Sequence, residues 1–142
     1  MRRLVLRPTY DSWGDVEILA DFLVSLGGVY NVYREGSDLV IEVGDGVNLG
    51  EVVRSVLDLG HELLLPHFVF SARPGLDDRE VVKRLLSSPI VVAAEYYPRS
   101  GRGVLVAVPG ASEEEVLGVL RQVFGGASLE SRFVQPVRMS FG

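Results

Sequence analysis

Two Arg-Pro pairs, beginning at Arg7 and Arg73, stand out because each follows a short apolar run and precedes an expected helix start. An arginine beside the free N–H groups of a helix N-terminus can hold a phosphate or a carboxylate. Acidic residues directly after each pair offer the same arginines an internal partner. Anion binding by Arg7 and Arg73 is therefore one hypothesis, and structural ion pairing is the alternative.

The segment "EYYPRSGRG", residues 95–103, combines aromatic and basic side chains: Tyr96, Tyr97, Arg99 and Arg102. Open sheets bind RNA by stacking bases on aromatic rings and contacting phosphates with basic groups. The formal charge of −5 and the pI near 5.0 disfavour phosphate-backbone binding, and tyrosine favours strands in its own right. We therefore do not expect nucleic acid to be the partner. These four residues remain candidates for contacting a ligand, the other sheet or another subunit.

Several chemistries are excluded or disfavoured by residue type. The chain has no cysteine, which excludes disulfides, thiolate zinc sites, cysteine-ligated iron–sulfur clusters and cysteine nucleophiles. Its two histidines, His61 and His67, have only Glu62 as a near third ligand, so we predict no metal site and no cofactor. No Gly-x-Ser-x-Gly motif is present. We assign no catalytic residue and expect a protein that is not an enzyme.

The elements that must position these candidates occur twice in the chain. "LVIEVGDGVNLGEVVRSVL" from residue 39 is matched by "VLVAVPGASEEEVLGVL" from residue 104. Each half reads as strand, helix, strand, strand, helix, strand, and each helix begins with a capping residue and an acid three positions later. The expected caps are Ser12, Asn48, Asp77 and Ser112. The expected strands are 4–6, 29–34, 39–43 and 61–65 in the first half, and 68–70, 90–97, 104–108 and 129–134 in the second.

This order predicts an α+β fold made of two tandem ferredoxin-like (βαββαβ) units that form a pseudo-twofold pair. The predicted boundaries are 1–66 for the first unit, 67–136 for the second and 137–142 for a C-terminal tail. Pro66 and His67 form the expected linker, which is too short for independent motion. The two sheets can pack face to face or join edge to edge.

The first half also resembles the heavy-metal-associated domain of copper chaperones and metal-transporting ATPases. The resemblance lies in "LVSLGGVYNVYREGSDLVIEV" and "LGEVVRSVLDLGHEL"; it covers residues 4–65 and, through the repeat, more weakly 68–134. The family's Met-x-Cys-x-x-Cys signature would fall on Tyr10, Ser12 and Asp15, none of which supplies a thiolate. The resemblance therefore implies the fold without the copper function. The same hydrophobic spacing is shared with other ferredoxin-like families, including ACT domains.

Length and composition indicate a globular protein. The chain has 142 residues, 47% of them hydrophobic, and no apolar run of the ~20 residues that a membrane span requires. We expect a soluble, cytoplasmic protein. Thermolabile residues are scarce, which is typical of a heat-adapted source. Lys83 is the single lysine among 14 basic residues, and a GC-rich genome would also favour arginine. The expected function is binding of a small molecule or a protein partner. The partner can also be another copy of the chain, which would make a homo-oligomer. The alternatives are an enzyme or anion binder that uses the cleft between units, and a nucleic-acid binder.

A fragment of residues 1–66 tests the dependence of the first unit on the second. We expect the fragment to fold poorly or to self-associate, because about 65 residues bury little apolar surface and the sheet loses its partner. Circular dichroism and analytical ultracentrifugation measure both properties. A monomeric fragment that unfolds cooperatively would contradict this expectation.

Overall fold

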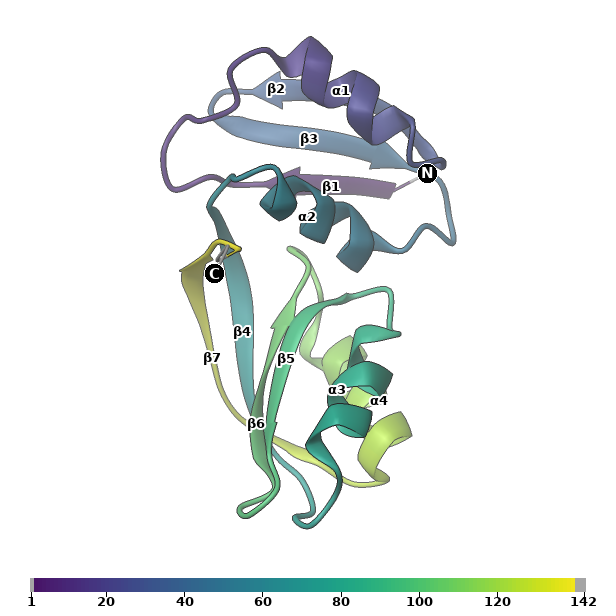
Figure 1. Ribbon diagram of the computed structural model, residues 1–142, viewed down its shortest axis with the longest axis vertical. Coiled ribbons are helices and arrows are strands. Elements are labelled where there is room, and N and C mark those ends of the chain that lie inside the picture. The colour runs from purple at the N-terminus through teal and green to yellow at the C-terminus, as the bar shows by residue number, and fades with distance from the viewer. Residues whose placement is uncertain (1, 140–142) are drawn as a thin grey trace.

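This computed structural model describes residues 2–139 of the chain (Figure 1). Within them, stretches with capping residues form four helices, and stretches of alternating apolar residues form seven strands. The strands form two antiparallel sheets, which confirms the predicted α+β class with two ferredoxin-like units. The elements are β1 (Arg2–Leu6), α1 (Val16–Val24), β2 (Val29–Glu35), β3 (Asp38–Val43), α2 (Leu49–Asp58), β4 (Leu63–Ser71), α3 (Asp78–Leu86), β5 (Val91–Tyr97), β6 (Arg102–Ala107), α4 (Glu113–Phe124) and β7 (Ser128–Val137).

The two sheets differ in completeness. The second has the four-stranded order β5-β6-β4-β7, and helices α3 and α4 lie on one of its faces (Figure 1). The first has the three-stranded order β1-β3-β2, with α1 and α2 on one face. The position of its fourth strand is occupied only by the start of β4, through a bridge between Pro8 and Leu63 and a 2.9 Å hydrogen bond from the Leu64 N–H to the Arg7 carbonyl. The sheets thus meet through β4.

Pro66 and His67 lie inside β4, so the predicted two-residue linker between separate strands at 61–65 and 68–70 is wrong. Pairing of β4 with β6 begins only at His67, whereas pairing with β7 starts at Leu63. Pro66 therefore has a neighbouring strand on one side alone, where a missing N–H is tolerated. At the other end of the second unit, β7 includes residue 137, the first of the predicted tail, and residues 140–142 lie outside the described residues.

Three of the four predicted helix caps are confirmed. Asn48, Asp77 and Ser112 cap α2, α3 and α4, and Ser112 forms a complete capping box with Glu115. The first prediction is wrong by three residues, because Asp15 rather than Ser12 caps α1. Between these two positions Gly14 has a φ of 60°, which interrupts a helical path.

Helix α2 of the first unit packs against β5 of the second. The Gly50 N–H donates to the Pro89 carbonyl at 2.8 Å, and the Arg54 guanidinium donates to the Val91 carbonyl at 2.7 Å. The buried apolar residues of both units belong to one continuous hydrophobic cluster. Within residues 2–139, no helix has the length and apolar character needed to cross a membrane.

Substitution Gly50→Ala tests this contact, because an added Cβ would lie 2.2 Å from the Val91 carbonyl oxygen. We expect a loss of about 1–3 kcal/mol in the free energy of unfolding, the usual cost of overpacking. The matched control is Gly118→Ala in α4, where a Cβ meets nothing within 4 Å. That change should stabilise the protein by about 0.5–1 kcal/mol through helix propensity. Urea unfolding measures both, and equal effects would refute the close contact.

Candidate functional site

A cleft of about 290 Å³ lies between the two units and contains one of the arginines singled out by sequence. It is lined by residues of β1 and the segment just after it, by residues of β4 and β7, and by the turn before α4. These residues are Val5, Arg7, Leu64, Pro66, Pro109, Gly110, Arg132 and Val134. The walls are apolar apart from the two arginines, so the cleft combines hydrophobic surface with positive charge.

Both cleft arginines have weak internal partners. The Arg7 side chain is 69% exposed, and its Nε and Nη2 atoms lie 3.5 Å from the Asp38 carboxylate oxygens. That separation is long for a charge-assisted hydrogen bond, which is typically about 2.7–2.9 Å. The Arg132 guanidinium lies 5.6 Å from the centroid of the Phe68 ring, a cation–π contact. Both guanidinium groups therefore retain N–H donors for a further anion.

Sequence reasoning missed Arg132, although it identified Arg7. Arg132 lies in β7, a strand interpreted from its apolar residues alone. The signal was its register, because Arg132 pairs with Phe68 and so faces the same side of the sheet as a fully buried residue. On that face, Arg132 lines the cleft together with Val134 of the same strand.

The predicted tyrosines of the second hairpin, which is formed by β5 and β6, face different environments. Tyr96 is buried, its hydroxyl donates to the Arg73 carbonyl at 2.7 Å, and its ring packs 5.4 Å from Phe124. Tyr97 is exposed and donates to the Glu95 carboxylate at 2.5 Å. This hydrogen bond, together with the Glu95 charge, raises the pKa of Tyr97. Tyr96 thus has a structural role, and the Tyr97 hydroxyl is occupied by its hydrogen bond to Glu95.

The other predicted residues of this region form a second group, away from the cleft. Arg102 binds Glu130, with its Nη2 2.5 Å and its Nε 3.1 Å from one carboxylate oxygen, whereas the Arg99 side chain is exposed. Arg73 is exposed beside this hairpin, since the Ala72 N–H donates to the Gly101 carbonyl. Arg7 and Arg73 are therefore near opposite ends of β4. The structure does not bring the two predicted anion-binding arginines together.

A cluster at the loop before α1 was not foreseen. Trp13 is 4% exposed, its indole N–H donates to the Ser37 carbonyl at 2.8 Å, and its ring lies 4.7 Å from that of His61. The Ser12 hydroxyl and the His61 Nδ1 are 2.9 Å apart. The cluster ties this loop to the residues just before β4. The single tryptophan beside an expected cap was the available signal, because leaving its ring in water would be costly.

Burial lowers the pKa of His61 below its ordinary value of 6.5. The unfolded chain therefore binds this proton at a higher pH than the folded chain does, so the His61 contribution to stability is complete above pH 6.5 and decreases as the pH falls through the folded pKa. We expect His61→Gln to remove this part of the pH dependence and His67→Gln to preserve it. Urea midpoints measured between about pH 5 and pH 8 test this. Parallel profiles for wild type and His61→Gln would contradict it.

Of three comparisons of this chain with known proteins, only the one with solved structures finds a similarity. No family model matches it, and no curated protein matches it. Among solved structures, it is similar to the N-terminal soluble domains of Bacillus subtilis CopA, with 12% sequence identity over 91% of this chain and 92% of that chain and a TM-score of 0.42. A similarity of this size supports no conclusion about function.

Proposed function

We propose that the protein is a non-catalytic binding module that holds a small organic anion in the cleft between its two units. The observation that carries the proposal is the position of Arg7 and Arg132, which come from different units and line the same apolar cleft. Two guanidinium groups can grip a carboxylate or a phosphate, since their planar N–H forks match these groups. The apolar walls then accommodate the body of the ligand.

The cleft is suited to binding rather than to catalysis. Its lining residues include no serine, histidine, carboxylate or other group that could act as a nucleophile or as a general base. Arginine stays protonated at any ordinary pH, so both arginines can neutralise charge but cannot exchange a proton. These properties favour the binding module over the enzyme alternative.

The nucleic-acid alternative has less support. Of the four hairpin residues, Tyr96 is buried, Tyr97 is bound to Glu95, and Arg102 is paired with Glu130. Buried Tyr96 cannot stack on a base, and a phosphate contact by Arg102 would compete with its ion pair to Glu130. The net charge of −5 adds general repulsion toward a polyanion.

Titration with acetate, hexanoate and inorganic phosphate, followed by calorimetry, tests the proposal. We expect hexanoate to bind more tightly than acetate, because only hexanoate uses the apolar walls. Arg7→Gln and Arg132→Gln should each weaken binding about tenfold or more, since a hydrogen bond to a charged group contributes about 1.5–3 kcal/mol. Added salt should weaken binding by the wild-type protein.

Arg99→Gln is the matched control, because Arg99 is an exposed arginine of the second hairpin that does not line the cleft. Its affinity should equal that of the wild type. The proposal is wrong if none of the three anions binds, or if Arg99→Gln weakens binding as much as the two cleft variants do.

A further inference from the structure

Helix α1 presents an apolar row to solvent and an acidic row beside it. Ile18 is 69% exposed and Phe22 is 40% exposed, one turn apart, whereas Leu19 and Leu23 face the core. Large exposed apolar side chains that gather on one helix mark a surface for docking. One residue before each of them stands an acid, Glu17 before Ile18 and Asp21 before Phe22, and the helix contains no basic residue. Within residues 2–139, neither acid takes part in an ion pair.

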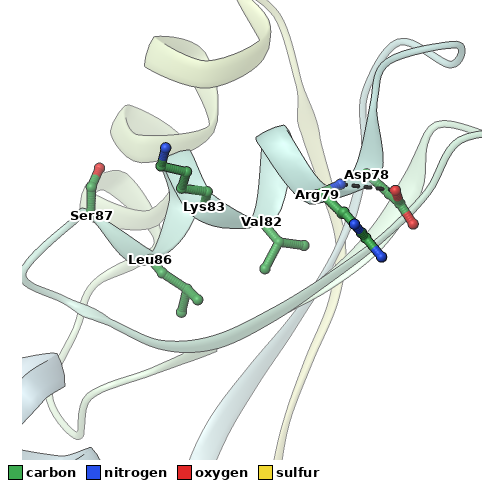
Figure 2. Close-up of a pocket in the computed structure, with 6 residues that line it drawn as sticks. All are labelled: Asp78, Arg79, Val82, Lys83, Leu86 and Ser87. Carbon is green, nitrogen blue, oxygen red and sulfur yellow. Dashed lines mark hydrogen bonds between the residues drawn. The ribbon is translucent and has the colours of Figure 1, made fainter.

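Helix α3 carries the complementary pattern. A hollow of about 570 Å³ lies along its outer side, and Figure 2 shows Val82 and Leu86 projecting from the same side of the helix, one turn apart. Arg79 and Lys83, also one turn apart, line the same hollow. Over the described part of the chain, these two cations have no carboxylate partner either. The surface is thus an apolar pair bordered by Arg79 and Lys83, with the acid Asp78 beside Arg79 at the start of the helix, on a protein whose net charge is −5.

The two helix faces match in spacing and are opposite in charge. Each has an apolar pair and a charged pair at i and i+4, which places the two pairs in adjacent rows along the helix. On α1 the acid precedes its apolar neighbour, whereas on α3 Lys83 follows Val82. Seen from outside each helix, the acidic row of α1 and the basic row of α3 therefore lie on opposite sides of their apolar rows. When the two helices face each other and run in the same direction, the two charged rows meet at the same edge of the contact.

We propose that α1 of one copy of this protein docks against α3 of a second copy, with Ile18 and Phe22 seated on Val82 and Leu86 and the charged rows paired alongside. Helix α1 covers the first sheet and α3 covers the second (Figure 1), so the α1 and α3 surfaces of one chain cannot contact each other. The contact uses different surfaces of the two copies. It therefore forms a closed dimer if both contacts of a pair can form together, and otherwise a ring or a chain of copies. None of its residues lines the anion cleft.

The experiment is a charge exchange on the full chain, read by sedimentation velocity over a concentration series. The wild type should self-associate, and added salt should weaken the association, because the paired charges are near the surface. Asp21→Lys and Lys83→Glu should each weaken self-association about tenfold or more, since each places like charges opposite one another. An equimolar mixture of the two variants should associate again, because the new lysine of one then faces the new glutamate of the other.

Matched controls carry the same change in charge at other exposed positions: Asp58→Lys near the end of α2, and Arg99→Glu in the second hairpin. Both should associate as the wild type does, and thermal unfolding followed by circular dichroism verifies that every variant is folded. A wild type that stays monomeric up to about 1 mM would overturn the proposal. So would variants that associate normally, controls that lose association equally, or a mixture that stays as weak as its components.

Discussion

The pairing of β4 with its neighbours is the constraint on which the rest of the structure depends. This strand has β6 and β7 as partners in the second sheet, and its first residues replace the missing fourth strand of the first sheet. Leu63, Leu65 and Phe68 are fully buried along it, so the same strand contributes side chains to one core that runs through both units. The contact of α2 with β5 then fixes the angle between the units, because Gly50 allows the two backbones to approach closely.

The strand that joins the units also positions the candidate site. The Leu64 N–H holds the backbone of Arg7, and Phe68 pairs with Arg132 across the sheet. The backbone of each arginine is therefore bound to β4 and does not lie in a mobile loop. The backbone positions of both arginines are set before a ligand binds, so no loop has to be ordered on binding. This is the physical reason for preferring the cleft over the hairpin, where the side chains of Tyr96, Tyr97 and Arg102 already have internal partners.

The parts that could be predicted from sequence are those encoded by local interactions. Asn48, Asp77 and Ser112 bond to backbone groups two or three residues away, so their role can be inferred from a short window. Ser12 could not be assigned correctly, because its partner His61 is 49 positions away. The sequence predicts a linker at Pro66 and His67, because the one-sided pairing that tolerates Pro66 inside a strand depends on where β6 starts. The site divides in the same way: a motif reveals Arg7, whereas only the strand register reveals Arg132 and separates buried Tyr96 from exposed Tyr97.

The position of β4 in the chain has a consequence for the order of folding. Both of its full partners, β6 and β7, follow it in sequence, and β7 is the last element within residues 2–139. During synthesis from the N-terminus, the apolar residues of β4 have no ladder partner until β6 has emerged, and their second edge stays open until β7 has emerged. These pairings are distant in sequence, which makes their formation slow compared with that of the helices. The nascent chain therefore leaves both ladder edges of its central strand unpaired until β6 has emerged, and cotranslational chaperones would encounter the protein there.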